Sequence, residues 1–289
     1  MSDIGGKGCE VLVPFEERKP LQEIERSIIT KYRKHIWSKF IKALKDFSMI
    51  EPGDKIAVAI SGGKDSMLMA KLFQELKRHG DDNFELEFVV MDPGYHHDIK
   101  RLMKDNCDYL NIPIQIYESG IFRIVDNIAK DYPCFMCAKM RRGALYTKAR
   151  ELGCNKLALG HHYNDVIETT MLNLLYTGCF KTMLPKLKST NFEEIELIRP
   201  LYYIEERHIE GFTQESGIWP LNCACMVAAK KTGNKRYEIK ELIKNLKENL
   251  HNNVDKSIFK AAQNVNLNAI LGWDKDGEHY SFLDFYQDE

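Results

Sequence analysis

The residues with the clearest chemical potential lie in the segment AVAISGGKDS, residues 57–66. A Ser-Gly-Gly turn at 61–63 joins a run of strand-forming residues to an amphipathic helix, so backbone N–H groups without partners are expected at the helix N-terminus. These donors and the helix dipole both favour an anion. Lys64 adds a positive charge for phosphate oxygens, whereas Asp65 would repel a triphosphate unless it held Mg²⁺ or capped the helix. The segment therefore predicts a nucleotide site with a metal ion.

Cysteine provides the second chemical pattern. The chain has eight cysteines, and two pairs stand out, Cys134 with Cys137 and Cys223 with Cys225. In a reducing compartment such pairs favour a metal site or catalysis over a disulfide framework. The Cys-x-x-Cys spacing by itself fits half of a zinc knuckle, half of a redox site or part of an iron–sulfur cluster. The other four are expected to be small core residues or inert thiols: Cys9, Cys107, Cys154 and Cys179.

The elements that would position these residues alternate along the chain. Five segments have strand character: 55–60, 86–91, 112–117, 156–160 and 195–199. Four segments have helical character: 67–79, 97–110, 140–152 and 164–176. The alternation predicts an α/β fold with a doubly wound, mostly parallel five-stranded sheet. Ligands of such sheets lie beyond the carboxyl ends of the strands, so the turn at 61–66, Asp92 and GHHYND at 160–165 are expected at one rim.

Three parts of the chain are expected to have separate roles. Residues 1–50 form an N-terminal segment with one helix over 21–48. Covering the sheet or a dimer partner is the favoured role of this helix, and contact with RNA is the alternative. Residues 51–216 form the ATP-binding α/β core, and residues 217–289 form a small helical appendage with a basic helix over 236–250. The acidic, aromatic tail of this appendage has no assigned role.

Composition limits the classes of function. Of 289 residues, 44% are hydrophobic and 29% charged, and the net charge is −1, so affinity for RNA would have to come from local patches. No apolar run approaches the roughly 20 residues that span a bilayer. The N-terminus lacks the order of a secretory signal, so we expect a cytoplasmic protein without a membrane partner.

Three basic clusters flank the expected cleft and would contact RNA: Lys139, Arg141, Arg142, Lys148 and Arg150; Lys181, Lys186 and Lys188; and Lys230, Lys231, Lys235 and Arg236. Basic runs are often only solvated faces, but three of them around one cleft favour contact with nucleic acid.

The glycine turn is shorter than the Walker loop, in which four residues separate the two glycines. SGGKDS resembles instead the PP-loop ATP pyrophosphatases, which adenylate a carbonyl oxygen with ATP and release pyrophosphate. This resemblance implies that the turn and the first helical residues cradle the β- and γ-phosphates: Ser61, Gly62, Gly63, Lys64, Asp65 and Ser66.

Later motifs narrow the resemblance. With CFMCAKMRRGALY at 134–146, LGHHYND at 159–165 and the segment from IRPL to Cys223, roughly residues 35–225 resemble the tRNA 2-thiocytidine synthetases (the TtcA family). The resemblance implies that Cys134, Cys137 and Cys223 hold a [4Fe–4S] cluster by three ligands. The fourth iron is then open for an exogenous sulfide.

The same resemblance implies further site residues. Arg141 would steady the adenylated intermediate, and Asp165 would be catalytic, whereas Gly160 and His161 would line the nucleotide site. Asp92 is expected to line the same site because it follows the second strand at this rim. Two positions depart from the family's pattern. Asn164 replaces the first aspartate of Gly-His-His-x-Asp-Asp, which alters contacts with Mg²⁺ or ATP. The late cysteines are spaced Cys-x-Cys, so Cys225 is an alternative ligand.

The predicted function is ATP-dependent thiolation of tRNA, in which a cytidine C2 carbonyl is adenylated and its oxygen is replaced by sulfur. The cofactors would be a [4Fe–4S] cluster, ATP and Mg²⁺, and the partners would be tRNA, a sulfide or persulfide donor, and a second copy in a homodimer. Two alternatives stay open. One is a PP-loop adenylating amidotransferase or ligase with structural zinc, and the other is a non-catalytic ATP- and RNA-binding module with a four-thiolate zinc site.

Overall fold

A computed structural model describes residues 18–80, 83–121, 133–221 and 235–286, with the backbone alone for 133–138. Six of its strands form one sheet in the order β3-β2-β1-β4-β6-β5. The strands are β1 Lys55–Ile60, β2 Glu85–Asp92, β3 Ile114–Glu118, β4 Lys156–Ala158, β5 Lys186–Lys188 and β6 Glu196–Ile198. All neighbours pair in parallel except β5 with β6. The predicted α/β class and the five predicted strands are confirmed.

The sixth strand was not predicted. Strand β5 has only three residues, and two of them are lysines, so it lacks the apolar alternation by which a strand is recognised. It exists because it pairs with β6, with Leu187 opposite Leu197. Strand order places β5 at the edge of the sheet, where short and charged strands are common.

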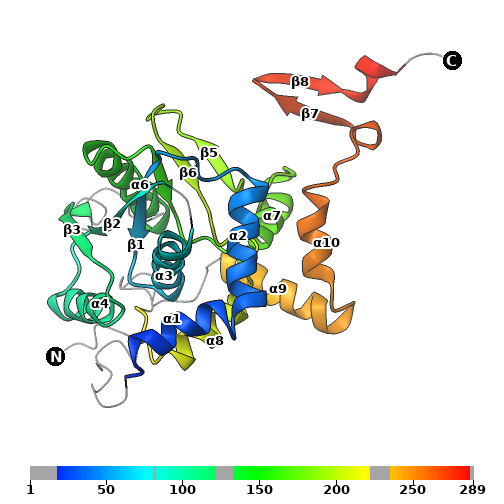
Figure 1. Ribbon diagram of the computed structural model, residues 1–289. Helices are drawn as coiled ribbons and strands as arrows, with labels where there is room; N and C mark the ends of the chain where they lie inside the picture. The colour runs from blue at the N-terminus through cyan, green and yellow to red at the C-terminus, as the bar shows by residue number, and fades with distance from the viewer. Residues whose placement is uncertain (1–17, 81–82, 122–132, 222–234, 287–289) are drawn as a thin grey trace. The chain divides into compact units, whose positions relative to one another are not determined.

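Helices alternate with the strands along the chain (Figure 1). They are α3 Lys64–His79, α4 His97–Tyr109, α6 Pro133–Glu151, α7 Tyr163–Thr177 and α8 Glu206–Glu215. Helix α6 packs Tyr146 and Ala149 against Ala57 and Leu157 of the sheet. Successive residues of a strand point to opposite faces of the sheet, so Ile56 and every second residue after it point to the face opposite α6. Helix α3 also contacts β1. This arrangement is the predicted doubly wound one.

The N-terminal segment differs from one continuous helix. It consists of α1 Leu21–Ile29, a π-helical turn η2 Arg33–Trp37 and α2 Ser38–Asp46. The sequence places apolar residues four apart along this segment: Ile24, Ile28, Tyr32, Ile36, Phe40 and Leu44. In a helix of 3.6 residues per turn, each step of four residues rotates the series by about 40° away from one face. The wider π turn restores the alignment, and Ile28, Ile36 and Phe40 are all fully buried.

The described chain divides into two compact units, Met1–Val166 with Leu184–Asn234, and Ile167–Met183 with Lys235–Glu289. The second unit contains α9 Lys235–Asn249, α10 Val254–Ala261, η3 Leu267–Ala269, β7 Gly272–Lys275, β8 Glu278–Ser281 and η4 Phe282–Phe285. Helix α9 confirms the predicted basic helix. Among the described residues, no helix has the length and apolar character needed to cross a membrane.

The β7–β8 hairpin makes the C-terminal appendage less helical than predicted. Its two-residue loop is Asp276-Gly277, and both residues have positive φ, 55° and 87°. Asp-Gly suits this type of turn, so the sequence contained the signal for the hairpin. Trp273 stacks on Tyr280 across the two strands, with ring centroids 5.5 Å apart.

Two of the four isolated cysteines are core residues, as predicted. Cys107 and Cys154 are buried, and burial raises the pKa of Cys107 to about 12 and that of Cys154 to about 11. Both thiols are therefore inert at neutral pH. Cys179 is exposed, and Cys9 lies outside the described residues.

Candidate active site

The turn between β1 and α3 is held by serine hydroxyls. Ser66 Oγ donates to the carbonyl oxygen of Gly63 at 2.9 Å and accepts from the backbone N–H of Ser61 at 3.2 Å. The N–H of Gly63 donates to Ser61 Oγ at 3.3 Å. Gly62 has φ +82°, a conformation that favours glycine. The two serines thus fix the shape of the turn from inside.

The N-terminus of α3 opens toward this turn. Gly63 is the N-cap residue and offers no side-chain acceptor, and Met67 makes the first helical bond, to Gly63. The N–H groups of Lys64 and Asp65 therefore have no acceptor within the helix. Together with the helix dipole they form a donor set that suits phosphate oxygens, as the sequence predicted.

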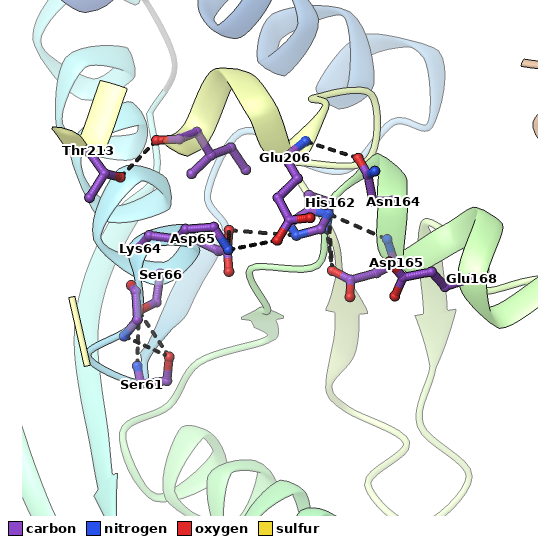
Figure 2. Close-up of polar contacts among 12 residues, drawn as sticks. Ser61, Lys64, Asp65, Ser66, His162, Asn164, Asp165, Glu168, Glu206 and Thr213 are labelled. Carbon is purple, nitrogen blue, oxygen red and sulfur yellow. Dashed lines mark hydrogen bonds and ion pairs between the residues drawn. The ribbon is translucent and has the colours of Figure 1, made fainter. Parts of the chain in front are cut away.

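Lys64 lies among carboxylates. Its Nζ is 3.1 Å from Glu206 Oε1 and 3.5 Å from Asp65 Oδ1 (Figure 2). Burial disfavours the charged amine, but Asp65 and Glu206 outweigh it and raise the pKa of Lys64 above its usual value. The lysine is therefore fully protonated and suited to an anionic ligand.

The carboxylate of Asp65 is buried with one oxygen unsatisfied among the described residues. Among the described residues its Oδ1 has no hydrogen-bond partner although it is buried, and only the longer contacts to Lys64 and to His162 Nε2, at 3.7 Å, approach it. Burial raises the pKa of Asp65 above its usual value, against the charges of His162 and Lys64. An oxygen of this kind fits a metal ligand. The described residues nevertheless contain no group of three or more acidic, histidine or cysteine side chains that could hold a metal ion.

His162 lies between Asp65 and Asp165 (Figure 2). It is buried, with its Nδ1 3.4 Å from Asp165 Oδ2, and its backbone N–H donates to the same oxygen at 2.9 Å. Asn164 Oδ1 accepts the backbone N–H of Glu206 at 3.0 Å. Asn164, which departs from the family's pattern, is therefore hydrogen-bonded to the first residue of α8. His161, the predicted nucleotide ligand, is half-buried beside them.

Gly160 allows strand β4 to approach α3. A Cβ at Gly160 would lie 3.3 Å from the Asp65 carbonyl carbon and 3.3 Å from the Ser66 nitrogen. Such contacts are tighter than usual, so any side chain would push the two segments apart. Two of the three motifs predicted at one rim, the turn at 61–66 and GHHYND at 160–165, meet at this contact.

Asp92 shapes the loop after β2. Its Oδ1 accepts the N–H groups of Gly94 and Tyr95 at 2.8 and 2.7 Å, and Lys100 Nζ lies 2.5 Å from Oδ2. Burial opposes ionisation, but these contacts hold the pKa of Asp92 below its usual value. Arg141 reaches the same loop, with Nη2 donating to Tyr95 Oη at 2.8 Å. Asp92 thus fixes the loop that follows β2.

The segment before Cys223 is fastened to the glycine turn. The N–H of Leu221 donates to Gly62 O at 2.9 Å, and a Cβ at Gly62 would lie 2.4 Å from Leu221 Cδ1. Asn106 Nδ2 of α4 donates to Trp219 O at 2.7 Å. Cys223 and Cys225 lie outside the described residues. The backbones of Cys134 and Cys137 lie at the start of α6, and their side chains are outside what is described.

The fold and the site define the class. A short Ser-Gly-Gly-Lys-Asp-Ser turn that opens a helix at the rim of a parallel sheet is typical of PP-loop nucleotide-binding proteins. The family model ATP_bind_3, described as a PP-loop domain, matches residues 20–220.

Relatives identify a narrower family. The tRNA-cytidine(32) 2-sulfurtransferase of Pelobacter propionicus is 39% identical over 235 residues, which cover 80% of this chain and 85% of that protein. The protein of the same name from Bdellovibrio bacteriovorus is 35% identical over 261 residues, which cover 89% and 96%. The chain belongs to the tRNA-cytidine(32) 2-sulfurtransferase family of PP-loop proteins, which confirms the resemblance found from its motifs.

A solved structure has the same fold. The U34-tRNA thiolase NcsA from Methanococcus maripaludis, with its [4Fe-4S] cluster, has a TM-score of 0.64 to this chain. The two are 22% identical, and the match covers 94% of this chain and 93% of that one.

Three residues of the site were not among the predicted ones. Glu206 and Leu221 contact the turn from far along the chain, and the buried Arg199 lies at the end of β6. All three belong to the segment from IRPL to Cys223 that supported the family resemblance, so that motif was the available signal.

Proposed function

We propose that this chain is an ATP-dependent tRNA thiolase that replaces the C2 oxygen of a cytidine with sulfur. The C2 carbonyl is amide-like, so its carbon is a poor electrophile and its oxygen a poor leaving group. Attack of this oxygen on the α-phosphorus of ATP releases pyrophosphate and leaves AMP bonded through the oxygen. Sulfide then adds to C2, the C–O bond breaks, and AMP departs with the oxygen and the bonding electrons.

The residues of the turn have distinct tasks in this proposal. The N–H groups at the start of α3 and the Lys64 ammonium bind the phosphates that leave, and the Asp65 carboxylate holds Mg²⁺ when the ion is bound. Holding both reactants in one geometry, with fixed charges around the phosphates, is the main catalytic contribution. A tRNA would present an unstacked loop base, because the grooves of A-form RNA hide base edges.

One observation carries the sulfur part of the proposal. Both segments that contain predicted cluster ligands are hydrogen-bonded to loops of this rim. Arg141 donates to Tyr95, and Leu221 donates to Gly62. Arg141 follows Cys137 by four residues, about 6 Å along a helix. Cys223 follows Leu221 by two residues, and that length of chain spans at most about 7 Å.

These anchors support a cluster held by Cys134, Cys137 and Cys223 beside the nucleotide turn. When bound, such a cluster supplies an iron with an open coordination position, which suits sulfide. The donor set fits the group, because three thiolates are soft ligands. Arg141 donates a hydrogen bond to Tyr95 in the loop after β2. We propose that its charge stabilises the adenylated intermediate.

The three parts of the chain have separate proposed roles. Residues 51–216 are the proposed ATP-binding part, and 217–289 contribute the third cluster cysteine, with 1–50 as a covering segment. The exposed Arg142 and Arg150 on α6 are proposed to contact tRNA, whereas Lys148 is engaged by Glu151 and the Tyr117 ring. A sulfide or persulfide donor, a homodimer and a cytoplasmic location complete the proposal.

Metal content tests this proposal against its alternatives. Protein purified without oxygen should be brown and contain about four irons per chain. Cys134→Ser and Cys223→Ser should lose the iron, and Cys179→Ser, at an exposed free cysteine, should keep it. One zinc per chain without iron would overturn the cluster and favour the structural-zinc ligase or the non-catalytic module.

Nucleoside mass spectrometry tests the substrate. Loaded enzyme with ATP, Mg²⁺, sulfide and unmodified tRNA should give 2-thiocytidine, with AMP and pyrophosphate in equal amounts. AMP formation should require the RNA. Aminated nucleoside instead of 2-thiocytidine would favour the ligase alternative, and ATP left unchanged would favour the binding module.

A further inference from the structure

Arg199 is a buried cation with no carboxylate partner in the described part of the chain. Only 6% of the residue is exposed, and among the described residues no carboxylate forms an ion pair with it. Its Nη1 donates to the carbonyl oxygen of Leu184, and its Nε is buried with no hydrogen-bond partner in the described part of the chain. A guanidinium has five N–H donors, so one carbonyl leaves most of its capacity unused.

The side chain stands at the rim that carries the nucleotide turn. Arg199 directly follows β6, which is parallel to β4, so both strands end at the same edge of the sheet. The carbonyl of Ile198, one residue before Arg199, accepts the N–H of Leu159 at 3.0 Å, immediately before Gly160. The backbone N–H of Arg199 donates to Pro185 O at 2.9 Å, which fixes the position of the residue.

The charges nearby do not neutralise Arg199. Burial lowers the pKa of Arg199 to about 10, and the positive charge of Arg142 on α6 lowers it as well, so the group is still charged at neutral pH. Asp165 acts in the opposite direction but forms no ion pair with it, and instead accepts the N–H of His162. The result is a region of positive charge between α6 and the start of α7.

A purely structural role does not account for these features. Hydrogen bonding to one carbonyl needs no charge, and an uncompensated buried charge is strongly unfavourable. Glutamine would donate to Leu184 without placing a charge in the interior. Buried guanidinium groups suit planar, bidentate recognition of oxyanions.

We propose that Arg199 binds a phosphate group of the substrate at the β4–β6 end of the rim, with Arg142 contributing to the same positive region. The phosphate belongs either to the nucleotide or to the RNA backbone next to the target base. This proposal rests on the proposed function for the source of the phosphate. Its test measures binding only, so it requires neither iron nor thiolation.

The test compares Arg199→Gln, which keeps a donor for Leu184 without the charge, with Arg199→Lys, which keeps the charge. Arg207→Gln is the matched control, because this arginine is exposed and pairs with Glu205. Calorimetry measures affinity for AMP and for pyrophosphate in one arm. Fluorescence anisotropy measures affinity for tRNA over a range of salt concentrations in the other.

We expect Arg199→Gln to weaken one arm tenfold or more and Arg199→Lys to weaken it less, with Arg207→Gln unchanged. A nucleotide phosphate gives the loss in the first arm. A backbone phosphate gives the loss in the second arm, with the slope of log K against log salt smaller by about 0.7–0.9. Affinities within twofold of wild type in both arms overturn the proposal.

A second variant covers the case in which Arg199→Gln does not fold. Arg142 is exposed, so Arg142→Gln should leave the melting temperature within about 2 °C of wild type. It should weaken the same arm about threefold, and Arg199→Lys should weaken it as well. Unchanged affinity in both of these variants would equally overturn the proposal.

Discussion

Lys64 Nζ lies 3.1 Å from Oε1 of Glu206, so the lysine expected to bind phosphate is already held by a carboxylate. The two residues are 142 positions apart, and Glu206 begins α8. A phosphate that binds Lys64 must compete with this carboxylate. The ion pair therefore sets the affinity for nucleotide as well as the position of the lysine.

Glu206→Gln should strengthen binding of pyrophosphate about twofold to fivefold, because a half-buried ion pair contributes on the order of 0.5–1 kcal/mol. Calorimetry with pyrophosphate measures the change. Glu205→Gln is the control, since Glu205 pairs with Arg207 and not with Lys64. Weaker binding in Glu206→Gln would mean that the carboxylate supports the bound state, for example through Mg²⁺.

Gly62→Ala should disrupt the turn for two separable reasons. Alanine at φ +82° is strained by about 1–3 kcal/mol, and its Cβ would overlap Leu221 Cδ1. Gly53→Ala is a matched control, with φ +90° and no atom within 4 Å, so it should show the strain alone. Urea unfolding of both variants measures the difference.

The Gly62→Ala/Leu221→Ala double variant separates the overlap from the backbone strain. Leu221→Ala by itself removes a buried side chain, so it is the reference, and adding Gly62→Ala to it should lower the stability by the strain alone. If Gly62→Ala is no less stable than Gly53→Ala, the close packing of Leu221 on the turn is not important for folding.

Local signals account for what could be predicted of this site. The strand, glycine turn and helix at 55–79 are adjacent in sequence, and their apolar periods and glycines specify them directly. The location of the site at one rim of the sheet could be predicted as well, because the carboxyl ends of parallel strands lie at the same edge. Asn164 and Asp165 were found as a motif, but the contact of Asn164 with Glu206 was not.

Tertiary contacts account for what was missed. Strand β5 depends on β6, and its own three residues carry no strand pattern. The partners of Lys64 and Gly62 come from residues beyond 200, and a sequence does not state which carboxylate or leucine reaches a given turn. The sequence alone could not predict that the N-terminal helix divides into three elements, because this depends on which residues, such as Ile36 and Phe40, are buried together.

Asp65 and Asp92 should give opposite dependences of stability on pH. The pKa of Asp65 is raised by burial, so its contribution to stability is complete below the usual value near 3.8 and is lost as pH rises through the folded-state pKa. The pKa of Asp92 is lowered by its contacts. Its contribution is present above 3.8 and is lost as pH falls through the folded-state pKa.

Asp65→Asn should therefore raise the melting temperature of the free protein at neutral pH, and Asp92→Asn should lower it. The Asp65 difference should shrink toward about pH 4, because that carboxylate becomes neutral in the folded protein as pH falls. The Asp92 difference should persist at about pH 4 and shrink only below it, because the folded-state pKa of Asp92 lies below 3.8. Calorimetric scans from about pH 3 to pH 8 measure both. A destabilised Asp65→Asn would show that the contacts of Asp65 with Lys64 and His162 outweigh the burial of its charge.

Asn164 tests whether the departure from the family's pattern is structural. Its Oδ1 accepts the N–H of Glu206 at 3.0 Å, so Asn164→Ala should lose about 1 kcal/mol in the free energy of unfolding. Asn164→Asp keeps an acceptor and adds a negative charge near the start of α8, which the helix dipole favours. Its stability should equal or slightly exceed that of wild type, by about 0.5 kcal/mol.

Binding of MgATP then separates the two roles of this position. If the family's aspartate is a metal ligand, Asn164→Asp should tighten MgATP without tightening pyrophosphate measured in the absence of Mg²⁺. Equal affinities in wild type and Asn164→Asp would make the position structural only, since the acceptor for Glu206 is present in both. A loss in Asn164→Asp would mean that a further negative charge next to the Lys64–Glu206 pair repels the phosphates, and that asparagine here favours the nucleotide.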